Sequence, residues 1–361
     1  GAFLSGGLDS SAIVGLMALH SSQPVQTFSV GCEELAFSEL GHARRVAQHF
    51  GTRHHELAVT SRLMVDSLED ANRFRDAPVA EPADVPILLL ARQAASQVKM
   101  VLGGEGADEV FAGYPKHRVA ALEDRHPGLM AAGRRVARLL SLGSLDWADA
   151  RIRTAVEAST LDGVQARKAR WFGSLAPQAV EMLCGSAPTD LLGDGAFPFD
   201  VDARCSSLRS SLHFDQTSWL PDNLLERGDR MTMAAGLEAR LPYLDPEVVA
   251  LASSLPDGFR LDRHGGKRIL KAAVRSLLPT DILDRPKAGF TMPTSLWLRT
   301  HLHENVRQML LGADALVGNL FRRAEVRRLV EEHLSGRRDR QKILWTLLNL
   351  EIWLRCHDVG L

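Results

Sequence analysis

Two glycine-rich loops, each with an aspartate near its end, are the segments of this sequence best suited to chemistry. The first covers residues 4–11, LSGGLDSS, and joins a short apolar run to a segment of helical periodicity. Glycines let a backbone approach a phosphate closely, serine hydroxyls add donors, and the first N–H groups of a helix point at an anion. The sequence therefore predicts a phosphate-binding loop, and the alternative is a polar helix cap without a ligand.

The charge carried by this loop indicates a metal. The loop lacks the lysine of the GxxxxGK[ST] phosphate loop and has Asp9 at its turn instead. An acid beside a polyphosphate is repelled unless a divalent cation lies between them. Asp9 therefore predicts Mg²⁺.

The second loop covers residues 103–114, GGEGADEVFAGY, and follows the apolar run 99–102. Ligands collect at the carboxyl ends of parallel strands, so the two loops are expected to face a common crevice. There Asp108 would share Mg²⁺ with Asp9, and Glu105 would orient or deprotonate a reacting group. The alternative is that Asp108 and Glu109 merely occupy the first turn of a helix, where acids favour the positive end of the dipole.

The elements that must position these loops have the pattern of an α/β fold. Apolar runs and helical periodicity predict strands at residues 1–4, 25–30, 54–57 and 99–102, and helices at 10–19, 38–50, 62–72 and 87–96. We therefore predict a parallel sheet with helices on both faces over residues 1–115, with a proline-broken loop at 76–82. Beyond residue 115 the strand signals fade. Residues 116–361 are expected to be mostly helical, with a flexible connection at 185–198.

Composition limits the class of protein. The chain has 361 residues, 45% of them hydrophobic, and a net charge of -1, which gives no global positive field for a polyanion. The Arg-rich stretch 134–170 is interpreted as a solvated helical face. The four cysteines have no metal-ligand spacing, and no apolar run has the length of a membrane span. These features favour a cytoplasmic protein that binds neither nucleic acid nor membrane, and the initial Gly1 predicts that further sequence normally precedes it.

A third group of charges lies in residues 220–245, among apolar residues. Charges in such surroundings are tolerated only when they are paired. For Glu238 and Arg240 we favour a structural ion-pair network over contact with a substrate.

Together these motifs resemble one known family. The SGGLDSS loop is similar to the pyrophosphate loop of the N-type ATP pyrophosphatases, and GGEGADEVFAGY resembles the SGEGADE-x-F-x-GY motif of asparagine synthetases, with Gly103 where that family usually has serine. Residues 220–245 resemble the LP-x-x-LL, DR-x-x-MA and LEAR-x-P-[FY]-LD signature of the same family, and residues 285–290 its RPK-x-GF segment. The resemblance covers nearly the whole chain. Residues 1–361 are therefore expected to form one asparagine synthetase domain, with an adenine nucleotide alpha-hydrolase-like core at 1–115 and a helical part at 116–361 that completes the active site.

The resemblance also implies the residues of the site. ATP is expected to be held by both loops and the second strand, through Leu4, Ser5, Gly6, Gly7, Leu8, Asp9, Ser10, Val30, Gly103 and Gly104. Mg²⁺ is expected on Asp9 and Asp108. The implied catalytic residues are Glu105, Asp108 and Lys287, where the lysine neutralises the α-phosphate and the departing pyrophosphate, and Lys267 is the alternative lysine.

The implied activity is that of a carbon–nitrogen ligase. ATP would adenylate the side-chain carboxylate of aspartate with release of pyrophosphate, and ammonia would displace AMP to give asparagine. The alternative is an asparagine synthetase-like amidotransferase or lactam-forming enzyme that acts on another carboxylate; a tRNA-thiolating enzyme and a degenerate scaffold protein are less favoured. The family takes ammonia from an N-terminal glutaminase domain with an initial cysteine, which this chain does not contain. Such a domain is expected upstream or in a separate subunit, and a homodimer is compatible with the pattern.

Overall fold

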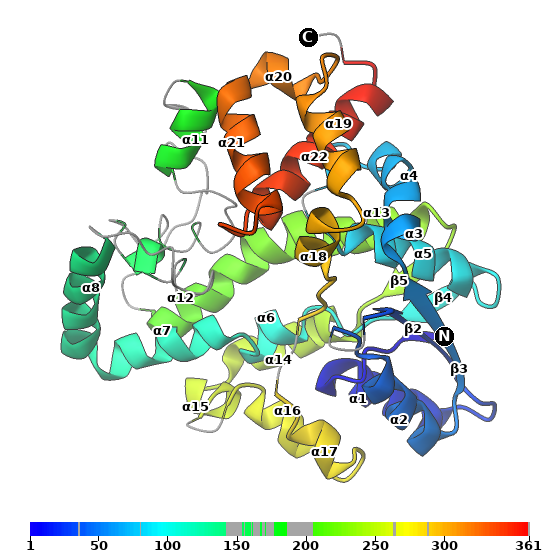
Figure 1. The fold of residues 1–361 in the computed structure, drawn as a ribbon. Helices are drawn as coiled ribbons and strands as arrows, with labels where there is room; N and C mark the ends of the chain where they lie inside the picture. The colour runs from blue at the N-terminus through cyan, green and yellow to red at the C-terminus, as the bar shows by residue number, and fades with distance from the viewer. Residues whose placement is uncertain are drawn as a thin grey trace. The chain divides into compact units, whose positions relative to one another are not determined.

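The protein is described by a computed structural model of the chain (Figure 1). The structure describes residues 1–361 except 35–36, 80, 142–153, 155, 160, 162–166, 168–169, 171–176, 186–204, 263–264, 287–288 and 360–361. The predicted connection at 185–198, apart from its first residue, lies outside the described residues. The chain divides into a first unit, Gly1–Phe74 with Pro82–Ala121 and Cys205–Pro293, and a second unit, Arg75–Glu81 with Leu122–Arg204 and Thr294–Leu361.

The first unit is built on a parallel sheet with strand order β3-β2-β1-β4-β5. Its strands are β1 (Ala2–Phe3), β2 (Gln26–Cys32), β3 (Arg53–Val59), β4 (Met100–Leu102) and β5 (Glu238–Arg240). The predicted α/β fold is confirmed, and the first four strands overlap the apolar runs that predicted them. No strand was predicted after residue 115, but β5 extends the sheet beside β4. This strand has one apolar residue, Ala239, between two charged ones, so no apolar run marks it.

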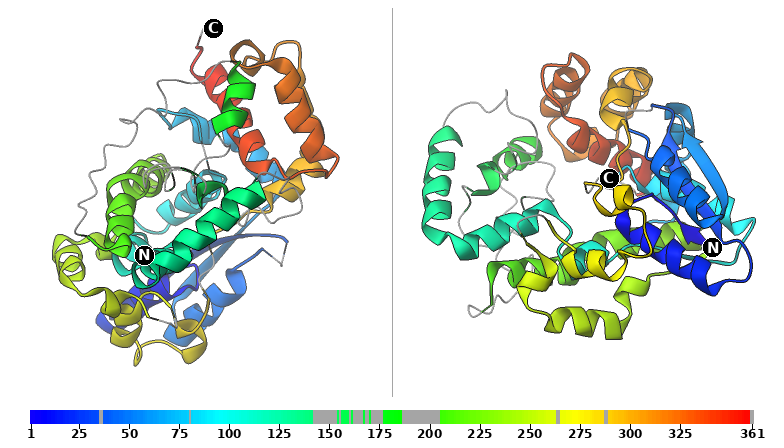
Figure 2. Two further views of the ribbon diagram at one scale, coloured as in Figure 1. Left: turned by 90° about the vertical axis from the view of Figure 1, so that its left-hand side faces the viewer. Right: turned by 90° about the horizontal axis from the view of Figure 1, so that it is seen from below.

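Helices cover both faces of the sheet (Figures 1 and 2). α1 (Leu8–His20) and α2 (Leu40–Phe50) pack on one face, and α5 (Asp84–Ala95) and α13 (Glu226–Met233) on the other. Side chains alternate along each strand, so the two faces have separate cores. Ala2 packs with Val14 and Val46 on the first face, and Phe28 packs with Leu90 on the second.

The strand order brings the carboxyl ends of β1 and β4 together. The chain runs outward from β1 to β2 and β3, then returns past β1 to add β4 and β5. Leu102 N donates to Gly1 O (2.9 Å) and pairs with Ala2, so the loops after β1 and β4 start at neighbouring points. A reversal of this kind leaves a crevice at the carboxyl ends of the strands, which is where ligands bind in open parallel sheets.

The remaining helices of the first unit are mostly short. They are α3 (Ser61–Asp66), α4 (Leu68–Arg73), α6 (Ala107–Phe111), α7 (Pro115–Arg125, which runs into the second unit), α12 (Ser207–Phe214), α14 (Pro246–Ser254), α15 (Asp257–Arg260), α16 (Arg268–Ala273) and α17 (Thr280–Leu283). The helix predicted at 62–72 is interrupted at Ser67 and forms α3 and α4. A π-helical segment, η1 (Asp215–Leu225), connects α12 to α13, and η2 (Pro242–Leu244) is a single 3-10 turn.

The regular elements described in the second unit are helices. They are α8 (Pro127–Ser141), α11 (Pro177–Cys184), α18 (Thr294–Arg299), α19 (His303–Leu311), α20 (Val317–Leu320), α21 (Arg323–Leu334) and α22 (Gln341–Cys356). α22 is the centre of this unit, because Leu344, Trp345 and Leu348 are almost fully buried and α19, α20 and α21 all pack against it.

Candidate functional site

The first glycine-rich loop connects β1 to α1 and is folded tightly on itself. Ser5 N donates to Ser10 Oγ (3.2 Å), the two Oγ atoms lie 3.1 Å apart, and Gly7 N donates to Ser5 Oγ (3.3 Å). Gly6 has a φ of +72°, and a Cβ at this residue would overlap the backbone of Ala43 in α2. Both constraints require glycine at residue 6.

The first loop leaves the N-terminal end of α1 without a side-chain cap. Gly7 is the N-cap residue of α1 and, as a glycine, has no side chain with which to cap the helix. Ser11 N donates to Gly7 O (3.0 Å) as the first bond of the helix, so the N–H groups before Ser11 point out of its end. Leu4 N donates to Phe28 O (2.8 Å), which fixes the start of the loop to the sheet. This arrangement can bind an anion.

The second glycine-rich loop follows β4 and lies against the first. Gly103 N donates to Arg240 O of β5 (2.9 Å), and a Cβ on Gly104 would come within 3.0 Å of Ser10 N. Glu105 is exposed, and its carboxylate occupies the space that a Cβ on Gly103 would need. The two loops therefore meet along Gly104 and Ser10, and Glu105 stands at their rim.

Asp9 and Asp108 converge on one cation, the ammonium of Lys267. Lys267 Nζ lies 2.7 and 2.6 Å from the carboxylate oxygens of Asp9 and 2.5 Å from Oδ1 of Asp108. The side chains of Lys267, Asp9 and Asp108 are 7%, 15% and 9% exposed. Buried charges are stable only when paired, so the three groups hold one another in place. Lys267 is the N-cap residue of α16, in agreement with its predicted place at the start of a helix. Its contact with both aspartates was not predicted.

The backbone near this ammonium is crowded. Ala112 and Lys267 have φ values of +61° and +57°, and a residue other than glycine pays about 1–2 kcal/mol for this left-handed conformation. A Cβ on Gly113 would overlap both the Asp108 carboxylate and the Lys267 side chain, and a Cβ on Gly266 would overlap the carbonyl of Ala112. The position of Lys267 is therefore enforced by the surrounding chain.

Tyr243 connects η2 to the first turn of α1. Its hydroxyl donates to Asp9 O (3.1 Å), and its ring packs edge-on against Phe111, with 6.3 Å between the ring centroids. Burial, together with the charges of Asp9 and Asp108, raises the pKa of Tyr243, so this hydroxyl stays a donor. The sequence includes Tyr243 in a motif but gives no signal of this contact.

Glu109, the residue after Asp108 in α6, is buried. It is 1% exposed, Tyr114 Oη donates to its carboxylate, and Gln216 donates to its backbone carbonyl (3.0 Å). Burial raises the pKa of Glu109 to about 7, against the effect of the Tyr114 hydrogen bond and with a further contribution from Asp108. Asp108 and Glu109 do occupy the first turn of α6, but for Asp108 the contact with Lys267 goes beyond a role in the helix.

Asp215 forms a separate buried ion pair at the start of η1. Lys116 Nζ lies 2.5 Å from its Oδ1, and His117 Nε2 lies 2.8 Å from its Oδ2. Asp215 and His117 are 1% and 0% exposed. This pairing fixes the first turn of α7 to η1.

Lys287 lies outside the described residues, so the structure does not place its ammonium. Arg285, two residues earlier, donates to Gly6 O (3.0 Å) and forms an ion pair with Glu39. The chain just before Lys287 is thus attached to the first glycine-rich loop. No role for Arg285 was predicted from the sequence.

Val30 and the pair Glu238–Arg240 complete the predicted residues. Val30 lies in β2, in register with Leu57 of β3, and is partly buried. Arg240 Nε donates to Glu238 Oε1 (2.8 Å), which is the favoured structural pair. The two side chains are 65% and 53% exposed on the edge strand, so the pair stabilises the fold little.

The donor set at Asp9 and Asp108 suits Mg²⁺ that is bound together with phosphate oxygens. Two carboxylates from neighbouring strand ends already share the position of a positive charge. Within the part of the chain that the structure describes, no three or more His, Cys, Asp or Glu side chains gather as metal ligands. Mg²⁺ commonly takes one or two carboxylates and completes its shell with water and substrate phosphates, so Asp9 and Asp108 fit such a site.

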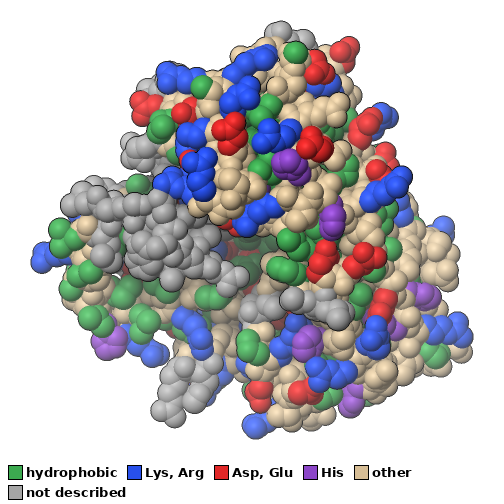
Figure 3. All heavy atoms as spheres, viewed as in Figure 1, with side chains coloured by type: hydrophobic (Ala, Val, Ile, Leu, Met, Phe, Trp, Pro, Cys, Tyr) green, Lys and Arg blue, Asp and Glu red, His purple; other side chains and the backbone are tan. Residues whose placement is uncertain are grey.

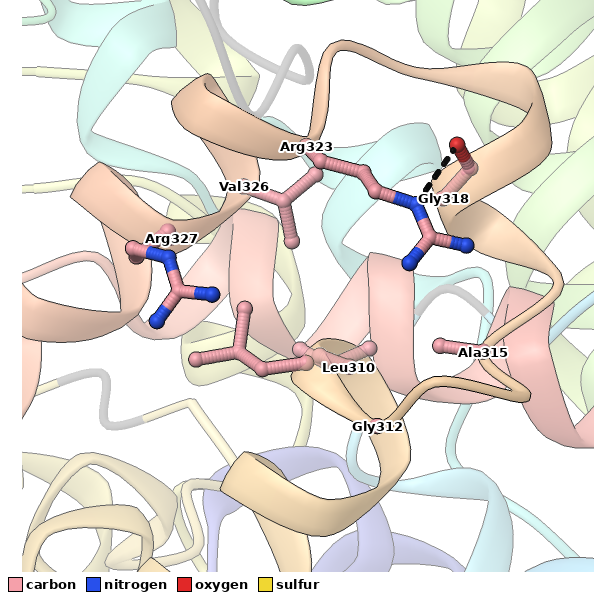
Figure 4. Close-up of a pocket in the computed structure, with 8 residues that line it drawn as sticks. Leu310, Gly312, Ala315, Gly318, Arg323, Val326 and Arg327 are labelled. Atoms are coloured by element: carbon pink, nitrogen blue, oxygen red, sulfur yellow. Dashed lines mark hydrogen bonds between the residues drawn. The ribbon is translucent and has the colours of Figure 1, made fainter.

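A small cavity in the second unit does not compete with this site. It has a volume of about 30 Å³ and is lined by Leu310, Leu311, Gly312, Ala315, Gly318, Arg323, Val326 and Arg327. Figure 4 shows Arg323 directed at the carbonyl of Gly318 (3.4 Å). A cavity of this size holds little more than a water molecule and excludes a nucleotide.

The charged surface is mixed. Figure 3 shows Lys and Arg side chains interspersed with Asp and Glu over the visible face. In the Arg-rich stretch, Arg134 pairs with Glu123 (3.2 Å) and Arg170 pairs with Glu157. Each of these two arginines is thus paired with a carboxylate. Most of the stretch from 142 to 169 lies outside the described residues, so the solvated helical face stays a prediction. Among the helices that the structure describes, none combines the length and apolar character needed to cross a membrane.

Comparison with known proteins assigns the chain to a family. The family model described as asparagine synthase matches residues 1–355. A putative glutamine-hydrolyzing asparagine synthetase of Mycobacterium tuberculosis is 35% identical over 368 residues, covering 98% of this chain and 54% of the relative. Glutamine-hydrolyzing asparagine synthetase 1 of Bacillus subtilis is 29% identical, covering 98% of this chain and 55% of the relative, and amidase chyE of Penicillium rubens is 24% identical, covering 85% and 51%.

This chain thus spans about half the length of the curated relatives it matches. The family model nevertheless covers nearly all of its residues, including both glycine-rich loops and the Lys267 segment. The chain belongs to the asparagine synthase family.

Proposed function

We propose that this chain is a carbon–nitrogen ligase that adenylates the side-chain carboxylate of aspartate and lets ammonia displace AMP to give asparagine. The observation that carries the proposal is the convergence of Asp9 and Asp108 on one cation position beside a phosphate-binding loop. The loops that carry them follow adjacent strands of a parallel sheet, where nucleotides bind in this class of fold. The names of the relatives support aspartate and ammonia as substrates.

ATP would lie between the two glycine-rich loops. The open end of α1 and the hydroxyls of Ser5 and Ser10 suit the phosphates, and the backbone near Val30 and Gly103 suits the adenosine. Gly104 keeps the two loops in contact without a side chain between them. Ser5 N and Gly7 N donate to serine hydroxyls within the first loop, and these hydrogen bonds hold the loop in its tight fold at the start of α1.

Asp9 and Asp108 would hold Mg²⁺ in this complex. Bound there, the ion would neutralise the phosphate charge that develops as pyrophosphate leaves. Tyr243 holds the first turn of α1 through Asp9 O, and Gly113 leaves room for the Asp108 carboxylate. These contacts orient the two ligands.

The reaction has two steps. A carboxylate oxygen of aspartate attacks the α-phosphorus, the bond from that phosphorus to the bridging oxygen breaks, and pyrophosphate leaves. Ammonia nitrogen then attacks the acyl carbon, the carbon–oxygen bond to AMP breaks, and the nitrogen loses a proton. Glu105, exposed at the rim of the loops, is the proposed acceptor of that proton, and Lys287 the proposed cation for the departing pyrophosphate, with Lys267 as the alternative.

Residues 1–361 are proposed to act as one synthetase domain, in which the part after residue 115 completes the site of the α/β core. Tyr243 and Lys267 support this proposal, because both come from the later part and contact Asp9. Ammonia would come from a glutaminase domain, upstream or in a separate subunit, as the relatives' glutamine-hydrolyzing names suggest. A cytoplasmic location and a homodimer are part of the same proposal.

A second candidate is amide or lactam formation on another carboxylate. It is favoured by one observation, the amidase name of a relative that aligns with most of this chain. The chemistry at the phosphates would be unchanged, and only the acceptor would differ.

The test is to incubate the chain with ATP, Mg²⁺, aspartate and ammonium, and to measure asparagine, AMP and pyrophosphate together. Equal amounts of the three products are expected, with loss in Asp9→Asn and Lys287→Ala. Asp281→Asn is the matched control, because Asp281 is an exposed partner of Arg45 and belongs to neither glycine-rich loop. Pyrophosphate release that does not depend on aspartate would reject aspartate as the acceptor and favour the second candidate.

A further inference from the structure

Lys267 holds the place that the proposed function assigns to the metal. Its ammonium contacts both carboxylate oxygens of Asp9 and one of Asp108. We propose that Lys267 is a built-in counter-ion: it keeps the two metal ligands together before Mg²⁺ and ATP bind, and the divalent cation displaces it. This inference rests on the proposed function and assigns Lys267 a positioning role rather than a direct one in the chemistry.

The need for a counter-ion follows from burial. Asp9 and Asp108 lie close to one another with most of their side chains removed from water. Two carboxylates in such a place repel each other, and they would move apart if no cation were present. The ammonium of Lys267 prevents this movement, because it is itself buried and lies between them.

The surrounding backbone fixes the position of the Lys267 ammonium. Lys267 N donates to Phe111 O (3.0 Å), which fixes the lysine backbone to the end of α6, the helix that carries Asp108. Gly113 leaves the space that the lysine side chain occupies, and Gly266 leaves room for the carbonyl of Ala112. Lys267 keeps a left-handed backbone, which a lysine without a fixed task would not require. A chance surface contact would show none of these features.

The position cannot hold both cations. Mg²⁺ on the same oxygens would repel the ammonium, and the flexible four-carbon stem of lysine allows the charge to move a short way while the backbone stays in place. The bound phosphates lie on the open side of α1 in the proposed complex, so the displaced ammonium has anionic oxygens to receive it. Binding of the metal is therefore coupled to movement of the Lys267 ammonium out of its place.

The test measures metal binding in the absence of nucleotide and aspartate. Mn²⁺ is titrated into the full 361-residue chain and followed by electron paramagnetic resonance, for wild type, Lys267→Met and Lys267→Gln. Wild type is expected to bind weakly, and both variants roughly tenfold more tightly, because the competing charge is gone. Lys267→Gln keeps a hydrogen-bond donor for the carboxylates and so remains informative where Lys267→Met unfolds.

Thermal unfolding gives the second readout. Both variants are expected to unfold at a lower temperature than wild type without metal, and Mn²⁺ is expected to restore much of the difference. In the double variant Asp9→Asn/Lys267→Gln, the gain in Mn²⁺ affinity should be lost. Lys271→Met, one helical turn further along α16, is the matched control and should leave Mn²⁺ binding as in wild type.

Equal Mn²⁺ affinity in wild type and folded Lys267→Gln would overturn the proposal and leave Lys267 as an ordinary structural ion pair. A loss of Mn²⁺ binding in that variant would also overturn it, because the lysine would then assist the metal instead of occupying its place. Neither result depends on product formation. A failure of asparagine synthesis alone would count against the proposed function and not against the exchange.

Discussion

Two buried carboxylates, Asp108 in the first unit and Glu351 in the second, are paired in different ways. Glu351 in α22 of the second unit is 0% exposed and accepts hydrogen bonds from Leu316 N (3.1 Å), Val317 N (2.8 Å) and Arg355 Nε (2.7 Å). The side chain of Asp108 in the first unit is 9% exposed and contacts the ammonium of Lys267, which it shares with Asp9. Burial of charge is common to both, so burial alone does not identify the functional one.

The difference lies in whether the donors can leave. Two donors to Glu351 are backbone N–H groups at the start of α20, which stay in place as long as the helix does. The donor to Asp108 and Asp9 is one side-chain ammonium, which can move without unfolding the chain. A carboxylate held by fixed donors is structural, whereas one that shares a movable cation is suited to exchange that cation for a metal.

The largest effect is expected for Asp108→Asn, which tests whether Asp108, unlike Glu351, is needed for activity. Asp108→Asn removes half of the charge that the two aspartates offer to a metal, and we expect product formation to fall by about 10³-fold, the usual scale for loss of a preorganised electrostatic group. Stability should change little, because the asparagine keeps an oxygen for Lys267. Steady-state asparagine formation is the measurement. Activity within a few-fold of wild type would place Asp108 with Glu351 among the structural carboxylates.

The reverse pattern is expected for Glu351→Gln. The substitution replaces one acceptor oxygen by an NH₂ group that faces backbone donors, and it weakens the bond to Arg355. We expect a loss of about 2–4 kcal/mol in the free energy of unfolding, since groups are left unpaired in a buried place. Urea unfolding with and without Mn²⁺ is the measurement. The metal should give no recovery, and recovery would show that the comparison with Asp108 fails.

Two glycines, one in each unit, differ in the room that the structure leaves for a side chain. A Cβ on Gly113 would overlap Asp108 and Lys267, whereas a Cβ on Gly133 in α8 of the second unit would meet nothing within 4 Å. Gly113→Ala is expected to lower the free energy of unfolding by about 1–3 kcal/mol through overpacking. Gly133→Ala is expected to raise it by up to about 1 kcal/mol, because alanine favours a helix. Equal effects of the two changes would show that Gly113 is not a constrained position.

The sequence predicted those parts of the fold and site that leave a local pattern. Apolar runs predicted β1 to β4, and glycines together with an aspartate predicted each of the two loops. β5 could not be predicted in this way, because a three-residue edge strand, Glu-Ala-Arg, has no apolar run. Its place depends on hydrogen bonds to Lys99 O and from Gly103 N, which are made across a long separation in sequence.

The cation between the aspartates was missed for a similar reason. Lys267 lies 258 residues after Asp9 in the chain, and nothing in its local sequence indicates a buried ammonium. Tyr243 and Arg285 contact the first loop across comparable separations, through Asp9 O and Gly6 O. Side chains of this kind are found from the tertiary structure, whereas the loops they support are found from the sequence.

The smallest expected effect concerns pH and the second unit. His333 in α21 is 0% exposed, and its Nδ1 accepts a hydrogen bond from Arg340 N (3.1 Å). Burial lowers the pKa of His333 from its ordinary value of 6.5; the charge of Asp339 opposes this effect and that of Arg299 adds to it. The unfolded chain therefore takes up the proton first as the pH falls below 6.5, and the folded state loses stability there.

His333→Asn keeps an acceptor for Arg340 N and removes the titrating group. Wild type is expected to lose at most about 1.4 kcal/mol for each pH unit below 6.5 from this histidine, until the pH reaches the folded pKa. The variant should lack that slope and should match the pH dependence of wild type at alkaline pH, where the imidazole is neutral in both folded and unfolded chains. Urea unfolding across this range is the measurement. Product formation should be unaffected, because a buried titrating group in the second unit contributes to stability only, and a change in activity would mean that His333 acts beyond its own unit.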